Sequence, residues 1–222
     1  MQASTLIGRI RRDLEKVNEQ LLQHPYVRSI EQGKVPWEKL RLFAGEQYTV
    51  ISSDLRSVAH LVTRYGSSPS RDFFLGILQG EKAAFEALQV FARALGLSET
   101  DLYLYEPLPG AHAYTAYMAW LALYGSEAQV AAGYLVNFPA WGMNCERLSR
   151  SLKDRFEMNE EQVRFFDLFA TPPATFEAQA SAIIQYGLDR GEEPRLVSRA
   201  ARLLQAYEVM YWDTLYNASV AS

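Results

Sequence analysis

The stretch from Trp37 to Tyr65 reads WEKLRLFAGEQYTVISSDLRSVAHLVTRY, and its apolar residues recur at steps of three and four. This spacing places them on one face of a long α-helix. Pro36 suits the first helical position because its missing N–H would be unpaired there, and Gly66 ends the pattern. A polar residue, Gln47, interrupts the apolar face. The stretch predicts an amphipathic helix with a polar group on its buried side.

Helical periodicity continues on both sides of this stretch. It predicts helices over residues 6–21, 36–65, 70–95, 112–124 and 126–153, and further helices that begin near residues 159, 172 and 194. We find no alternating strand pattern, no repeat and no low-complexity linker. The sequence therefore predicts an all-α fold, a compact bundle of about seven to eight helices in a single domain over residues 1–222. Two all-helical domains are the alternative.

The composition excludes several classes of protein. Of the 222 residues, 49% are hydrophobic and 22% charged, as in globular proteins, and the net charge of −4 gives no reason to bind nucleic acid or an anionic membrane. The single cysteine, Cys145, cannot form an intrachain disulfide, which fits a reducing compartment. No signal peptide or stretch long enough to span a bilayer is evident. We expect a cytoplasmic protein.

Two glutamates interrupt apolar faces in the same way as Gln47. Glu81 lies in the 70–95 pattern, and Glu208 lies in the last helix, next to Tyr207, Tyr211 and Trp212. Burial raises the pKa of a carboxyl group and can make it a general acid or base near neutral pH. The alternative is that each is a structural residue, hydrogen-bonded in the core or turned to solvent.

The helix over 126–153 contains a proline next to a polar residue. Pro139 leaves the carbonyl of Leu135 without its helical partner, and Asn137 lies beside it. Free polar backbone beside a polar side chain often lines a cavity, although a simple kink is the alternative reading. The three histidines form no HExxH motif and no pair of Glu-x-x-His motifs, so the sequence predicts no metal site and no cofactor.

Four short motifs together resemble the TenA/THI-4/PqqC-like family, which has the haem-oxygenase-like fold. They are His24-Pro25-Tyr26, Glu46-Gln47-Tyr48, Ala113-Tyr114-Thr115-Ala116-Tyr117-Met118 and Tyr207-Glu208-Val209-Met210-Tyr211-Trp212. The resemblance covers nearly the whole chain. It implies a homodimer or homotetramer, because family members assemble through helix faces.

The family includes thiaminase II, which hydrolyses thiamin or its aminopyrimidine breakdown products. In that enzyme a cysteine attacks the ring, an aspartate holds the amidine edge and a glutamate on the last helix transfers protons. By this resemblance Glu208 matches the glutamate, Tyr114 a ring-facing tyrosine and Tyr211 an aromatic pocket residue.

The departures from thiaminase II fall on its key positions. Asn137 stands at the cysteine position, Gln47 at the aspartate position, and Val50 and Trp141 at tyrosine positions. Asparagine cannot form the covalent adduct, and Cys145 lies roughly two helical turns further along. The resemblance therefore does not imply ordinary thiaminase activity.

Other relatives are PqqC, a cofactor-free oxidase, and a set of di-iron oxidases. Glu81 matches one di-iron ligand, but Leu88 and Leu135 stand at two other ligand positions, and the late histidine-rich ligand group is absent. A di-iron centre is therefore not expected.

Three hypotheses for the function follow. The first is a pocket for a small planar heterocycle, with Glu208 as acid/base in a C–N hydrolysis. Its ligand-binding residues would be Gln47, Glu81, Tyr114, Asn137, Trp141 and Tyr211. Because Gln47 both donates and accepts hydrogen bonds, the ligand would differ from aminopyrimidine in its hydrogen-bond pattern or charge. The second is a non-catalytic ligand-binding or partner-interaction module, and the third is a PqqC-like oxidase without a cofactor.

Overall fold

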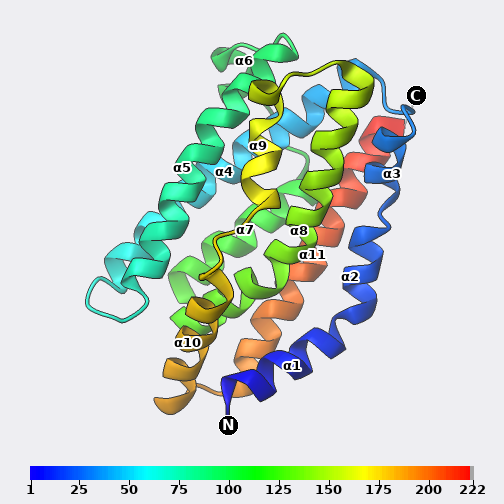
Figure 1. The fold of residues 1–222 in the computed structure, drawn as a ribbon. Helices are drawn as coiled ribbons and strands as arrows, with labels where there is room; N and C mark the ends of the chain where they lie inside the picture. The colour runs from blue at the N-terminus through cyan, green and yellow to red at the C-terminus, as the bar shows by residue number, and fades with distance from the viewer. Residues whose placement is uncertain (221–222) are drawn as a thin grey trace.

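Eleven α-helices and one 3-10 turn make up the fold in a computed structural model that describes residues 1–220 (Figure 1). In chain order they are α1 (Ala3–Asp13), α2 (Glu15–Leu22), α3 (Pro25–Glu31), η1 (Trp37–Lys39), α4 (Leu40–Arg64), α5 (Arg71–Ala94), α6 (Glu99–Tyr103), α7 (Pro109–Tyr124), α8 (Glu127–Phe156), α9 (Glu160–Ala170), α10 (Phe176–Asp189) and α11 (Pro194–Val220). Within this range there is no strand, so the predicted all-α class is confirmed.

Six helices form a closed ring around the core. Along the ring, α4 packs on α5, α5 on α9, α9 on α8, α8 on α11, α11 on α7, and α7 again on α4. Helix α10 covers α8, while α1, α2 and α3 lie outside α11 and α8 (Figure 1). The apolar faces predicted from the sequence point into this ring, because that is where they leave water.

The structure has more helices than the seven or eight expected, and the additional ones are short. The predicted helix over 6–21 is two helices that meet at Leu14. Helix α3 lies between the first two predicted helices: Pro25 occupies its first turn, and Nδ1 of His24 accepts a hydrogen bond from the backbone N–H of Tyr26. Helix α6 begins at a capping box formed by Ser98 and Asp101.

Several predicted helix ends agree with the structure. Gly96 has a φ of +74° after α5, Asn159 and Gln162 form a capping box before α9, and α11 begins at Pro194. Pro139 lies inside α8, and the helix continues on both sides of it. Helix α10 was predicted to begin near residue 172 but begins at Phe176. Pro172 and Pro173 belong to the loop that precedes it.

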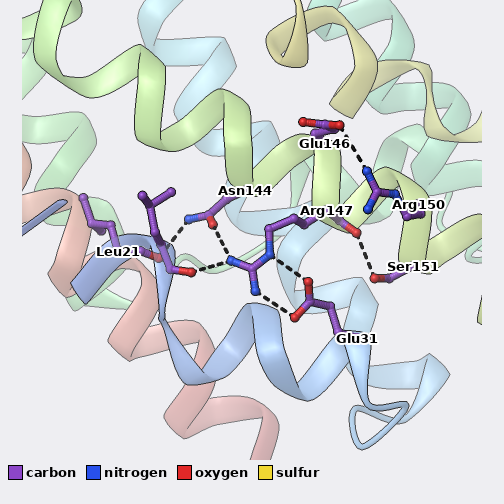
Figure 2. Close-up of polar contacts among 8 residues, drawn as sticks. Leu21, Glu31, Asn144, Glu146, Arg147, Arg150 and Ser151 are labelled. Carbon is purple, nitrogen blue, oxygen red and sulfur yellow. Dashed lines mark hydrogen bonds and ion pairs between the residues drawn. The ribbon is translucent and has the colours of Figure 1, made fainter. Parts of the chain in front are cut away.

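A polar network joins α8 to the N-terminal helices (Figure 2). The Arg147 guanidinium donates to both carboxylate oxygens of Glu31, each over 2.7 Å, and also to the carbonyl of Leu22. Asn144 Nδ2 donates to the carbonyl of Leu21 over 3.0 Å. These two side chains therefore satisfy carbonyls at the C-terminus of α2, which have no partner within their own helix.

Within residues 1–220, none of the helices combines the length and the apolar character needed to cross a membrane.

Candidate functional site

A small cavity of about 30 Å³ lies at the centre of the ring. All six ring helices contribute side chains to its wall. The lining residues are Gln47, Val50, Ile51, Asp54, Glu81, Tyr114, Tyr134, Asn137, Phe138, Trp141, Phe169, Glu208 and Tyr211. All seven site residues predicted from the sequence are among them, although they come from five separate helices.

Glu208 is the best-held carboxyl group in this wall. Its side chain projects from α11 and is 4% exposed. Trp212 Nε1–H, one turn further along the same helix, donates to Oε1 over 2.7 Å, and Asn137 Nδ2–H donates to Oε2 over 3.3 Å. Burial raises the pKa of Glu208 to about 7, although these two donors oppose the shift. Near neutral pH the group can therefore both give and take a proton.

Asn137 links the cavity by hydrogen bonds to Gln205 of α11 and, through it, to α2. Its Oδ1 accepts a hydrogen bond from the Tyr114 hydroxyl over 3.3 Å, and its Nδ2 also donates to Oε1 of Gln205 over 3.1 Å. Gln205 in turn donates to Asn18 on α2 over 2.6 Å. The amide orientation of Asn137 is therefore fixed by partners on three sides.

The opposite wall is formed by α4. Gln47 Nε2 donates to the Tyr211 hydroxyl oxygen over 2.6 Å, so the Tyr211 hydroxyl proton is free to donate elsewhere. Burial raises the pKa of Tyr211, which keeps the phenol protonated. Trp141 packs edge-on against Tyr211, with 6.3 Å between ring centroids. The preceding residue, Glu46, does not line the cavity; it accepts hydrogen bonds from Tyr105 and from the backbone of Leu108.

One carboxyl group in the wall, that of Asp54, was not predicted from the sequence. Asp54 on α4 is 4% exposed and Glu81 on α5 is 5% exposed, and both side chains line the cavity. Burial raises the pKa of each, and the charge of Asp54 raises that of Glu81 further. The signal for Asp54 was present: it lies seven residues after Gln47, on the same helix face. Leu55, which fits the apolar spacing of the same helix, is only partly buried.

Cys145 does not take part in this site. It is fully buried on α8, does not line the cavity, and burial raises its thiol pKa well above the ordinary value. A thiol is a poor nucleophile until it ionises, so the position and the protonation state both argue against a covalent role.

A larger apolar pocket of about 330 Å³ adjoins the central cavity. The two share Glu81, Phe138 and Phe169, so these side chains separate them. Gly76 and Gly80 of α5 line the larger pocket, and an added Cβ at either would meet no atom within 4 Å. We call this the outer pocket. In the region the structure describes, no group of three or more His, Cys, Asp and Glu side chains is arranged to hold a metal ion.

A closed ring of six helices around a small central cavity is typical of the haem-oxygenase-like fold. The structure aligns with haem oxygenase-1 from the cyanobacterium Synechocystis sp. PCC6803, solved in complex with haem, at a TM-score of 0.70 and 13% identity, covering 97% of this chain and 94% of that one. The chain belongs to the TENA/THI-4/PQQC family, whose model matches residues 11–218. The resemblance predicted from the motifs is thus confirmed.

Two solved TenA homologues have similar structures. The homologue from Pseudomonas syringae pv. tomato DC3000 aligns with a TM-score of 0.83 and 13% identity, covering 98% of this chain and 96% of that one. The homologue from P. horikoshii OT3 aligns with a TM-score of 0.77 and 17% identity, covering 96% and 98%. At these identities the likeness establishes the fold alone. A comparison with curated proteins gives no match to this sequence.

Proposed function

We propose that the protein binds a small planar heterocycle in the central cavity, and that Glu208 transfers protons in the hydrolysis of a C–N bond. One observation carries this proposal: an enclosed carboxyl group faces the cavity, is held from two sides, and has a pKa of about 7. Proton transfer is most efficient when the pKa of the acid or base lies near the working pH.

Water would be the nucleophile in this reaction, because Asn137 cannot form a covalent adduct. The Glu208 carboxylate takes a proton from the water as its oxygen bonds to the ring carbon, and then gives that proton to the departing nitrogen. The cavity of about 30 Å³ has room for water. Tyr114, Trp141 and Tyr211 would contact the ring, while Gln47 and Asn137 would present neutral hydrogen-bonding edges to it.

A ring needs more room than the cavity has. Cavities that bind benzene measure about 150 Å³, against about 30 Å³ here. Rotation of Phe138 and Phe169 would join the central cavity to the outer pocket, and the combined space would accept a heterocycle. We therefore propose that the ligand enters from the outer pocket.

Binding without turnover is the second candidate. The observation that favours it is Asn137 itself, whose neutral amide hydrogen-bonds to Glu208 from the position that the resemblance assigns to the nucleophile. The third hypothesis, a PqqC-like oxidase, gains no such support: the side chains that line the cavity include no His, Arg or Lys in the part of the chain that the structure describes.

The test is turnover of a panel of aminopyrimidines and related heterocycles by the wild type and by Glu208→Gln, with products followed by chromatography. We expect Glu208→Gln to lower kcat by about 10²- to 10⁴-fold while ligand binding persists. Glu46→Gln is the matched control, because Glu46 is a buried glutamate outside the cavity. Equal turnover by wild type and Glu208→Gln would remove Glu208 from the mechanism. Binding without product by the wild type would establish the second candidate.

We also propose that the chain assembles as a homodimer or homotetramer and works in the cytoplasm. Helix α7 is apolar around most of its circumference, and Trp120, Leu123 and Tyr124 remain exposed on it. A helix that is apolar all round is normally covered on every side. Light scattering would give a multiple of the 25.2 kDa chain mass, and a monomer mass would overturn the assembly.

A further inference from the structure

Two buried carboxyl groups of the central cavity have oxygens without any hydrogen-bond partner. They are Oδ1 of Asp54 and Oε2 of Glu81, and the hydroxyl of Tyr134 in the same wall is also without a partner. These groups come from α4, α5 and α8, so three helices direct unsatisfied polar atoms toward one space. Buried polar atoms in folded proteins usually have partners, and the residues of these three unpartnered atoms line one cavity.

No protein cation neutralises the pair. Within residues 1–220, the walls of the central cavity and of the outer pocket contain no Lys, Arg or His. Without a cation, burial favours the protonated form of both carboxyls, and a positive charge between them would let them ionise and form ion pairs. The cavity therefore has a place where a positive charge can be paired, and the side chains of its wall among residues 1–220 do not supply one.

The shape of the adjoining space indicates what carries that charge. Glu81 belongs to the walls of both the central cavity and the outer pocket. The outer pocket of about 330 Å³ is lined mainly by apolar side chains, among them Phe73, Ile77, Leu168 and Phe176. A molecule with a charged head and an apolar body would place the head at Glu81 and the body among these side chains.

We propose that Asp54 and Glu81 bind the cationic nitrogen, an ammonium or amidinium, of a ligand whose apolar body lies in the outer pocket. The inference rests on the proposed function, since it uses the same cavity, and it names the ligand class. It changes one inference made from Gln47: although the amide of Gln47 is neutral, the ligand can still be a cation, because an ionisable carboxyl group lies two turns further along α4, at Asp54.

The experiment compares benzylamine with benzyl alcohol, which has nearly the same shape and no charge. At about pH 7 an aliphatic amine is protonated. Calorimetry with the wild-type protein should give about tenfold or tighter binding of benzylamine than of benzyl alcohol, since the ammonium brings both a positive charge and N–H donors to carboxyl oxygens that lack partners. The doubly substituted protein, Asp54→Asn with Glu81→Gln, should bind the two compounds equally.

The controls separate a binding role from a structural one. The two carboxamides keep the volume of the original side chains and remove the ionisable groups, so we expect a folded variant by circular dichroism with no loss of thermal stability. Equal binding of amine and alcohol by the wild type, undiminished preference for the amine in the double variant, or no amine binding at all would each overturn the inference.

Glu208→Gln distinguishes this inference from the proposed function. Turnover of the heterocycle panel by Glu208→Gln tests the proposed function alone, while Glu46→Gln, whose glutamate lines neither pocket, should bind benzylamine as the wild type does. Loss of amine preference in Asp54→Asn with Glu81→Gln, together with equal heterocycle turnover by wild type and Glu208→Gln, would refute the proposed role of Glu208 and leave the cation site standing. If the double variant keeps its preference for the amine while Glu208→Gln loses turnover of the heterocycle, the cation site alone is refuted.

Discussion

The side-chain amide of Asn137 donates to Oε2 of Glu208 over 3.3 Å, so the two residues behave as one unit across α8 and α11. Asn137→Asp would replace the donor by a second carboxyl group, and we expect the pKa of Glu208 to rise further above about 7. Carboxyl carbon chemical shifts measured against pH would show this. Asn144→Asp is the control, since Asn144 is buried on the same helix but bonds to the Leu21 carbonyl. An unchanged Glu208 titration in Asn137→Asp would contradict the coupling.

Glu208 should make the fold less stable as pH rises. Its folded pKa of about 7 exceeds the ordinary value of 4.5, so the folded state holds the proton more tightly than the unfolded chain. The stabilisation is complete below about pH 4.5 and is lost as pH rises through about 7, an effect on the order of 3 kcal/mol. Chemical denaturation between these limits should show a steeper decline for the wild type than for Glu208→Gln. Parallel curves would contradict the assignment.

Two glycines in the middle of α5 reduce helix stability without an evident packing need. Gly76 and Gly80 have free space where a Cβ would stand, so alanine at either position should stabilise the protein by about 1 kcal/mol. For a chain of this size that corresponds to about 2–4 °C in Tm by differential scanning calorimetry. Gly45→Ala is the contrast: its Cβ would overlap the ring of Tyr105, so Tm should fall.

A larger side chain at Gly80 should obstruct the outer pocket. Because Gly80 lines that pocket, Gly80→Leu would fill part of it and weaken binding of heterocycles and of benzylamine alike. Gln79→Leu adds the same side chain to the neighbouring exposed position of α5, which is not part of the pocket wall, and should leave affinity unchanged. Calorimetric titration would measure the affinity of both variants for these ligands. Unchanged affinity in Gly80→Leu would show that the ligands neither bind in the outer pocket nor enter through it.

Arg147 should contribute more to stability than its neighbour Arg150. Arg147→Lys would lose the bidentate ion pair with Glu31 and the hydrogen bond to the Leu22 carbonyl (Figure 2). We expect the free energy of unfolding to fall by about 1–2 kcal/mol. Arg150 forms an exposed pair with Glu146 one turn away, and Arg150→Lys should change stability by less than about 0.5 kcal/mol. Equal shifts in denaturation midpoint would contradict this ranking.

Periodicity was sufficient for the fold and for three polar residues of the cavity, whereas Tyr114, Trp141 and Tyr211 were found only through the family resemblance. Gln47, Glu81 and Glu208 were found from spacing, because a polar residue on an apolar helix face points into the core when that face is buried, and all three line one cavity. Asp54 was missed because the face of α4 also fits Leu55, and a 3.6-residue period does not distinguish adjacent positions over several turns. Helices α3 and α6 were missed because they are too short to show a period.

The outer pocket could not be predicted from the sequence. It depends on how Phe138 of α8 and Phe169 of α9 pack against α5, and on an open helix face at two glycines. No local pattern encodes such a contact between distant segments. The same limit applies to the partnership of Asn137 with Gln205 and Asn18, which joins residues far apart in the chain.

The hydrogen bond from the Trp212 indole to Glu208 gives the protein an internal fluorophore at the cavity. Ionisation of the carboxyl group changes the electric field at the indole ring, and so shifts its emission. Protonation of Glu208 and arrival of a molecule beside it could thus be followed optically in the unlabelled protein.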